Sequence, residues 1–370
     1  MDARITSGHD EDRGCDRPPE RLSGRGAGSR TAVREVCCTP DTLSCPASVP
    51  GIQAMPMQRW RGGLMGGVFV AGSKATTAAP QGAGLRVVAR REAPVRLQRS
   101  EGRARLAFKR RGGDTVLADL YQSGCSKVRL PASHGRRDAE AVLLNTAGGL
   151  TDGDSIATEV RWGEGAGAVV TSQAAERVYK SRGGEANIET RLDAGPNARA
   201  CWLPQETILF DGGRLVRRTE VRLHETARLL ACESLVLGRA AMGETVQEGA
   251  VHDGWRIRVG GSLVFADALR LDGDIAGAVA RPAVTGDATA LATVLYVGAD
   301  AGDALPVARA ALDGDGAGAT LIGPVLVVRL LCPKGAELRS GLGAVLERLM
   351  PRICDGQGAP RVALPRVWRC

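Results

Sequence analysis

The glycine-rich stretch LLNTAGGLTDGDS, at positions 143–155, has the residue types of a ligand-binding loop. Gly148 and Gly153 have the glycine spacing of a phosphate-binding loop, in which a lysine must follow the second glycine to neutralise the phosphates. Asp154 stands at that position instead, and its negative charge would repel a phosphate. The dinucleotide pattern G-x-G-x-x-G fails here as well. The stretch is therefore not expected to bind a nucleotide.

A calcium loop is the second chemistry that this stretch suggests, because Asp152 and Asp154 alternate around a glycine. An EF-hand needs further oxygen ligands and a glutamate at its twelfth position. Counting from Asp152 places Gly163 there. A solvated acidic turn explains the pattern better than a calcium site does.

Nucleophilic catalysis has few candidate residues. The chain has 4 histidines, of which His134, His224 and His252 lie outside the N-terminal segment, and no G-x-S-x-G elbow is present. The alternation of its strand places His224 on a polar face, which favours a solvated surface histidine. A β-rich hydrolase whose active site has no known motif stays an alternative, with these three histidines as its candidates. The sequence itself predicts no catalytic residue and no enzyme.

Transition-metal spacing is also absent from positions 96–370, where no H-x-H, H-E-x-x-H or paired-cysteine motif occurs. The chain has 10 cysteines, but they are scattered, and a chain of 370 residues does not need disulfide staples. We expect most of them to be reduced thiols in the cytoplasm. A weak metal site assembled from distant strands stays open.

Charge and hydropathy limit the remaining function classes. The net charge is +8, but the arginines are spread along the chain and aromatic residues make up only 3%. Nucleic-acid binding would need a concentrated basic patch with stacking aromatics, so it is not expected. No apolar run reaches the ~18 residues of a membrane helix. The charged start of the chain is not a signal peptide.

Two segments differ in composition. Positions 1–95 mix Arg, Asp, Pro, Gly, Ser and Cys without apolar periodicity, which predicts either disorder or a gene model that starts upstream of the true initiator. From position 96 a β-rich domain is expected. Apolar and polar residues alternate on both sides of RGGD at 111–114 and of Gly260-Gly261, which predicts two hairpins.

The same alternation predicts which side chains face the core. The inward residues are Leu106, Phe108, Thr219, Val221, Leu223, Trp255, Ile257 and Val259. GPVLVVRLLCP, near the C-terminus, predicts a buried central strand. Helical periodicity occurs only at 303–315 and 341–353. The predicted fold is mainly β: a large single domain of many short strands and hairpins with one or two late α-helices.

Seven segments share small or apolar residues with isolated carboxylates and arginines. They are LADLYQSGCSKVRLP, AVLLNTAGGLTDGDSI, TSQAAERVYKS, WLPQETILFDGGRL, LGRAAMGE, WRIRVGGSLVFADALRLDG and LPRVW. In this order they resemble the urease accessory protein UreD family, called UreH in some organisms. The resemblance spans about positions 102–368, and positions 1–95 have no counterpart in it.

The resemblance implies a non-enzymatic maturation factor with a largely β fold. It implies binding to urease apoprotein and to a UreF-like helical accessory protein, which in turn recruits a UreG-like GTPase. It also implies help in delivering nickel to urease and a polar passage for the ion, with no tightly bound cofactor. A structural or carbohydrate-binding β module ranks last, since such modules rely on aromatic platforms and this chain has 5 Trp, 3 Tyr and 4 Phe.

The candidate residues for a polar passage or partner contact are isolated polar groups within these segments. They are Thr171, Gln173, Glu176, Glu206, Glu244 and Asp267. The alternative is that they are buried structural pairs. One departure from the family stands out: the family usually reads L-T-G-G-D where this chain has Asp152 after Thr151. If the position needs a positive φ, aspartate tolerates it less well than glycine.

Overall fold

The computed structural model describes residues 98–131, 137–354 and 364–369. The prediction for positions 1–95 and the candidate His134 lie outside these residues. Strands dominate the described part, which confirms the mainly β prediction, and the longer helices come late in the chain. The strands form two sheets.

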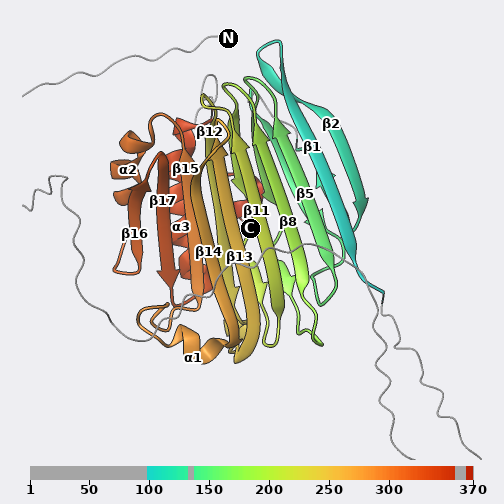
Figure 1. The fold of residues 1–370 in the computed structure, drawn as a ribbon, viewed down its shortest axis with the longest axis vertical. Coiled ribbons are helices and arrows are strands. Elements are labelled where there is room, and N and C mark those ends of the chain that lie inside the picture. The colour runs from blue at the N-terminus through green and yellow to red at the C-terminus, as the bar shows by residue number, and fades with distance from the viewer. Residues whose placement is uncertain (1–97, 132–136, 355–363, 370) are drawn as a thin grey trace, which may run out of the picture. The chain divides into compact units, whose positions relative to one another are not determined.

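The first sheet has seven strands in the spatial order β14-β13-β11-β8-β5-β1-β2. Figure 1 shows it from the front, with the two terminal strands β14 and β2 at opposite sides. The strand bounds in that order are β14 (Ser262–Asp274), β13 (Glu248–Val259), β11 (Arg214–Leu223), β8 (Ala186–Ala194), β5 (Ser155–Trp162), β1 (Glu101–Arg111) and β2 (Asp114–Gly124).

The second sheet has ten strands. Eight follow the order β16-β17-β15-β12-β9-β6-β4-β3, and β10 pairs with both β12 and β7. Their bounds are β16 (Ala317–Ile322), β17 (Val325–Cys332), β15 (Ala290–Val297), β12 (Arg228–Leu237), β9 (Arg199–Leu203), β6 (Gly167–Ser172), β4 (Ala139–Asn145), β3 (Ser126–Arg129), β10 (Thr207–Leu209) and β7 (Glu176–Val178).

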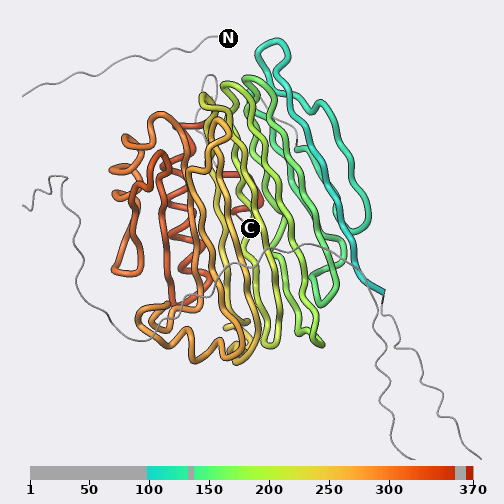
Figure 2. The backbone as a smooth tube through the Cα atoms, in the orientation of Figure 1, coloured from blue at the N-terminus to red at the C-terminus, as the bar shows by residue number. Residues whose placement is uncertain are grey.

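The middle of the chain winds between the two sheets. From β4 to β13 each long strand in one sheet is followed by one in the other, so β5, β8, β11 and β13 run parallel in the first sheet and β4, β6, β9 and β12 in the second. The tube in Figure 2 accordingly changes colour steadily across the front sheet. Two neighbouring parallel strands are therefore separated in the sequence by a long strand of the other sheet.

The two predicted hairpins are confirmed. β1 pairs antiparallel with β2 and β13 with β14. Gly112 and Gly113, with φ of 59° and 92°, and Gly260 and Gly261, with φ of 57° and 86°, occupy the turns. A tight hairpin turn with two consecutive positive φ angles matches the right-handed twist of the two paired strands. Glycine adopts positive φ angles without strain.

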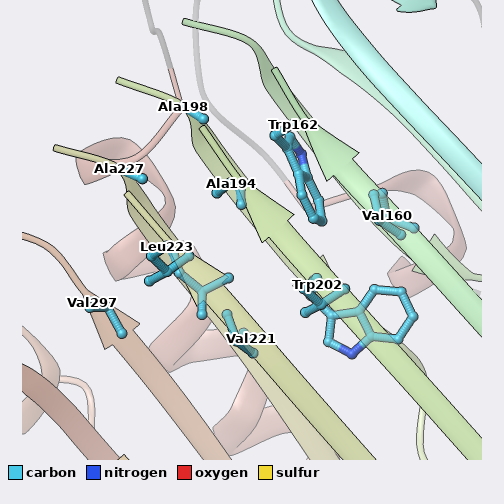
Figure 3. Packing of buried hydrophobic residues seen from close by; sticks show 14 of the residues in the cluster. Val160, Trp162, Ala194, Ala198, Trp202, Val221, Leu223, Ala227 and Val297 are labelled. Carbon is cyan, nitrogen blue, oxygen red and sulfur yellow. The ribbon is translucent and has the colours of Figure 1, made fainter. Parts of the chain in front are cut away.

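The predicted inward residues face the space between the sheets, where they are buried except for half-buried Val259. Figure 3 shows part of this apolar cluster, in which Trp162 and Trp202 lie among small residues such as Ala194 and Ala198. A second apolar cluster, containing Leu150, fills the opposite end of the interior. The two clusters together provide the buried apolar area that holds the sheets face to face.

Three helices accompany the sheets: α1 (Ile275–Val279), α2 (Ala301–Arg309) and α3 (Gly335–Leu349). Helices α2 and α3 pack on the outer face of the second sheet, α2 beside β16 and β17 and α3 beside β15 and β17 (Figure 1). The predicted stripe of Leu342, Val345, Leu346 and Leu349 is buried. However, α3 begins at Gly335 rather than Gly341, and α2 ends at Arg309 rather than near 315. The short α1 carries too few residues for a periodic signal.

The remaining helical turns are short 3₁₀ segments. They are η1 (Ala240–Met242), η2 (Met350–Arg352) and η3 (Arg366–Arg369). Strand β17 is buried as predicted, although it lies next to the edge strand β16 rather than at the centre of its sheet.

Candidate functional site

A polar belt crosses the interior between the two apolar clusters. In the first sheet, strand register places Thr158 of β5 beside Thr190 of β8 and Thr190 beside Thr219 of β11. In the second sheet, Glu233 of β12 lies beside Thr293 of β15, which lies beside Arg329 of β17. All but Arg329 are buried. Buried polar groups cost free energy unless they are hydrogen-bonded or ion-paired. Such a belt therefore indicates either complete pairing of its polar groups or a functional role.

A cavity of about 230 Å³ lies in this belt, between β5 and β8 of the first sheet and β4 and β9 of the second. Polar side chains from both sheets and from the loop after β6 line its walls. The exposed residues on its lining, Gly148, Gln173, Ala174 and Arg177, mark its mouth. The polar side chains of the lining are Ser126, Lys127, Asn145, Thr158, Ser172, Gln173, Glu176, Arg177, Thr190, Gln205, Thr207, Arg217 and Glu233.

Glu176 is the carboxylate nearest the mouth. It begins β7, and its backbone N–H donates to Glu206 O at 2.9 Å, which fixes the start of the strand. Asn145 Nδ2 donates to Glu176 Oε1 at 2.9 Å. Burial raises the pKa of Glu176 to about 7, although the hydrogen bonds from Asn145 and from the backbone of Arg177, and the charge of Arg177, each act to lower it. This carboxylate therefore exchanges a proton near neutral pH.

Arg217 and Glu233 form the inner end of the cavity. Arg217 Nη2 donates to Asp253 Oδ2 at 2.6 Å and Nε to Oδ1 at 3.1 Å, which makes a two-pronged ion pair. Its Nη1 donates to Thr207 Oγ1 at 3.0 Å. Glu233 Oε1 accepts from Thr219 Oγ1 at 2.9 Å. The group is almost completely buried, so the charges interact strongly.

The C-terminus holds one wall of the cavity. Arg339 of α3 donates from Nη1 to Gln205 Oε1 at 2.6 Å and to Glu206 Oε2 at 3.1 Å, and from Nη2 to Trp368 O at 3.1 Å. Trp368 Nε1 donates to Thr171 Oγ1 at 3.1 Å. These contacts fix Gln205, which lines the cavity, through a residue near the end of the chain.

The model of the UreD urease accessory protein family matches residues 100–369. The chain belongs to the UreD family of urease accessory proteins. It is an accessory factor in urease maturation.

Curated relatives share much of the sequence. The chain is 44% identical over 275 residues to the urease accessory protein UreD of Agrobacterium fabrum, which covers 74% of this chain and 93% of that protein. It is 46% identical over 283 residues to the UreD of a Methylobacterium species, covering 74% and 96%. It is 47% identical over 284 residues to that of Xanthobacter autotrophicus, covering 76% and 94%.

The turn in which this UreD-family chain departs from the usual L-T-G-G-D is structural. Asp152 is not among the residues with positive φ, whereas Gly153 has a φ of 82°. The substitution therefore costs no backbone strain. Asp152 Oδ2 accepts from Arg99 Nη2 at 2.9 Å, and Asp154 accepts from the backbone N–H groups of Ser100 at 2.7 Å and Thr151 at 2.8 Å. Neither aspartate lines a cavity described above.

The six predicted residues fall in different places. Gln173 and Glu176 line the cavity. Asp267 pairs with Arg329 at a second, smaller cavity. The remaining three lie off both cavities: Thr171 and Glu206 in the C-terminal contacts given above, and Glu244 in an ion pair with Arg239 at 2.8 Å. Their roles in passage or partner contact stay predictions.

The two histidines among the described residues are not brought together with a nucleophile. His224 is exposed, as predicted, and its Nδ1 lies 3.0 Å from Thr226 Oγ1. His252 Nε2 lies 3.7 Å from Asp272 Oδ2. Neither lines the cavity. Within the described ranges, the five cysteines are free thiols and His, Cys, Asp and Glu form no cluster of three or more suited to a metal ion.

Sequence reasoning missed Arg217, Glu233 and Asp253, although a signal was available. Arg217 has the same parity in its strand as the inward Thr219 and Val221, so alternation places it in the interior. An arginine at an inward position predicts a buried carboxylate partner.

None of the helices in the described part is long and apolar enough to span a membrane.

Proposed function

We propose that this UreD-family protein is a non-catalytic scaffold in the complex that delivers nickel to urease apoprotein. The observation that carries the proposal is the cavity lined by Glu176 in a chain of a urease accessory family. In this proposal the nickel ion is cargo, and the cavity offers it isolated oxygen ligands instead of a closed cage.

The chemistry of the lining supports transit more than storage. Ni²⁺ binds tightly to sets of thiolate and imidazole ligands, whereas a single carboxylate with amide and hydroxyl oxygens binds it weakly. Passage requires ligands that attract the ion and also release it. Because Glu176 exchanges its proton near pH 7, it can give up the proton when a cation arrives and recover it when the cation leaves.

The proposal includes the partners that the family resemblance implies. A UreF-like helical accessory protein binds the chain, a UreG-like GTPase joins through that protein, and urease apoprotein receives the ion. We also propose the cytoplasm as the compartment, where cysteines such as the five free thiols remain reduced.

The test uses cells that contain the urease cluster but lack this gene, complemented with the full chain. Nickel per urease molecule is measured after complementation with the unaltered chain, with Glu176→Gln, and with Glu225→Gln as a control at an exposed position. Glu176→Gln is expected to lower nickel loading while the partners still co-purify, and Glu225→Gln is expected to leave both unchanged. Full nickel loading of urease in cells without the chain would disprove the delivery role.

A further inference from the structure

The outer face of the first sheet carries rows of charged side chains. Helices α2 and α3 cover the outer face of the second sheet, whereas none of the described helices lies over this one (Figure 1). Strand register shows which exposed side chains are neighbours here. From β1 to β14, one row contains Arg105, Glu159, Arg191, Glu220, Arg256 and Ala266. Opposite charges alternate along this row as far as Arg256, which favours the pairing of the strands.

The alternation fails in the next row toward the β13–β14 turn. From β1 to β14, that row contains Ala107, Arg161, Asp193, Arg222, Arg258 and Leu263. Charges alternate from Arg161 to Arg222, and the following position would need a carboxylate to continue the pattern. Arg258 stands there instead, opposite Arg222 in the register of β11 and β13.

This pair of like charges destabilises the isolated sheet. Neighbouring strands lie about 4.8 Å apart, which is less than the Debye length of about 8 Å at physiological ionic strength. Salt therefore weakens the repulsion between the two guanidinium groups but does not remove it. A partner that places a negative charge between them would turn this repulsion into attraction.

The carboxylates nearby do not supply that charge to Arg258. Asp193 Oδ1 lies 3.8 Å from Arg222 Nη1, and Glu220 Oε2 lies 4.0 Å from Arg222 Nη2. Among the described residues, neither Arg256 nor Arg258 takes part in an ion pair. Arg258 Nη1 donates only to Gly261 O, at 3.4 Å. All three arginines are exposed.

An apolar side chain borders these arginines. Leu263 lies beside Arg258 in register and is 49% exposed, and Ala266 lies beside Arg256. Both belong to β14, which is the last strand of its sheet. Arginines beside an apolar contact are typical of a protein-binding surface, whereas single-stranded nucleic acid would need aromatic side chains for stacking.

We infer that Arg222, Arg256, Arg258 and Leu263, here called the arginine corner, form a docking surface for an acidic segment of a protein partner in urease maturation. A carboxylate of the partner lies between Arg222 and Arg258 and restores the alternation of charge. An apolar side chain of the partner covers Leu263. Arginine suits this contact because its planar guanidinium binds a carboxylate through two parallel hydrogen bonds. The inference rests on the proposed function for the set of partners.

The first experiment measures partner retention. The tagged full chain is co-expressed with the urease cluster and captured, and the resin is washed with NaCl from about 0.05 M to about 0.5 M. Urease apoprotein and the UreF-like protein that remain are quantified. Arg222→Gln with Arg258→Gln is expected to bind at least one of them about tenfold more weakly at low salt. The difference from the unaltered chain should vanish at high salt. Unchanged retention of both partners, or loss of co-purifying RNA alone, would overturn the inference.

A second measurement separates docking from folding. Arg258→Gln alone removes the repulsion with Arg222, so the thermal midpoint of the full chain is expected to stay the same or to rise while partner retention falls. Arg258→Lys keeps the charge and is expected to recover part of the lost retention. A midpoint that falls together with retention, without recovery in Arg258→Lys, would show that Arg258 supports the fold and that the inference is wrong.

Two further variants test the place and the chemistry of the contact. Arg103→Gln with Lys109→Gln removes the same charge from β1, at the other side of the same sheet face, and is expected to leave retention unchanged. An equal loss in this control would assign the effect to the charge of the whole face and overturn the inference. Leu263→Ser is expected to lower retention at low and at high salt, because salt does not screen an apolar contact. Unchanged retention in Leu263→Ser would contradict the apolar part of the contact.

The two proposals fail in different ways. If urease is fully loaded with nickel in cells without this chain, the delivery role fails, while partner retention still reports on the arginine corner. If Glu176→Gln lowers nickel loading and the variants at Arg222 and Arg258 retain both partners, the delivery role stands and the docking surface is wrong.

Discussion

Two groups of acidic residues in this molecule differ in what surrounds them. Asp152 and Asp154, in the turn before β5, accept hydrogen bonds from backbone N–H groups and from Arg99. Glu176 and Glu233, in the polar belt, each accept one hydrogen bond from a neutral side chain, Asn145 and Thr219 respectively, and Glu233 Oε2 also lies 3.3 Å from Arg217 Nε. The first two are occupied by structural contacts. In the belt, Glu233 is paired with Arg217, whereas Glu176 retains capacity to bind a proton or a cation.

The pKa values follow the same division. Burial alone would raise the pKa of Asp152, but hydrogen bonds from the Arg182 backbone and from Thr151, with the charge of Arg99, together lower it. Burial raises the pKa of Glu176 to about 7 because too few donors face it. Hydrogen bonding thus separates carboxylates that build the fold from carboxylates available for exchange.

The largest expected effect comes from the structural group. Asp154→Ala leaves the N–H groups of Ser100 and Thr151 without an acceptor and removes two charge-assisted hydrogen bonds. We expect a loss of about 4 kcal/mol in the free energy of unfolding, measured by chemical denaturation. A loss below about 1 kcal/mol would show that water replaces the carboxylate and that the two groups do not differ as argued.

A smaller effect, of opposite sign, is expected for Glu176→Gln. The folded-state pKa of about 7 lies above the unfolded value of 4.5, so between these pH values the folded state binds more protons and stability falls as pH rises. The unaltered chain should therefore lose about 3 kcal/mol more than Glu176→Gln between pH 4.5 and pH 8. Denaturation curves at several pH values measure this difference. Parallel curves for the two proteins would place Glu176 in contact with water.

The smallest effect is expected for Asp152→Gly, which restores the usual family pattern. The aspartate contributes a partly exposed ion pair with Arg99, and glycine adds backbone entropy to the unfolded state. The expected loss is about 1 kcal/mol, and it should shrink in high salt because ions screen the pair. A salt-independent loss would assign the effect to the backbone instead. Nickel loading of urease should not change.

The predictable part of the fold was local in sequence. Each hairpin turn carries two adjacent glycines, and Leu106 and Phe108 show the period of two that a half-buried strand requires. Strand order was not predictable, because parallel partners such as Thr190 and Thr219 meet only after a full winding through the other sheet. Alternation states which face a residue occupies, but it does not state which strand lies beside it.

The candidate site divides in the same way. Glu176 was among the predicted residues because of its segment, yet its partner Asn145 lies 31 positions earlier and nothing local links them. Arg217 was not among the predicted residues, although strand alternation places it on the inward face. The adjacent Arg218 makes the stretch look like a charged, solvent-exposed run. Pairs such as Glu206 with Arg339, 133 positions apart, depend on the packing of α3 and carry no local signal.

The contact between Trp368 and Thr171 has a consequence for synthesis. The two residues are 197 positions apart, and the tryptophan lies close to the end of the chain. Strand β6, which carries Thr171, leaves the ribosome long before Trp368 does, and domains begin to fold from their N-terminal parts as they emerge. Until Trp368 has left the ribosome, the nascent sandwich has neither the tryptophan on its outer face nor the carbonyl group of Trp368 that Arg339 binds beside Gln205. The wall of the cavity is therefore completed long after the strands that line it have been made.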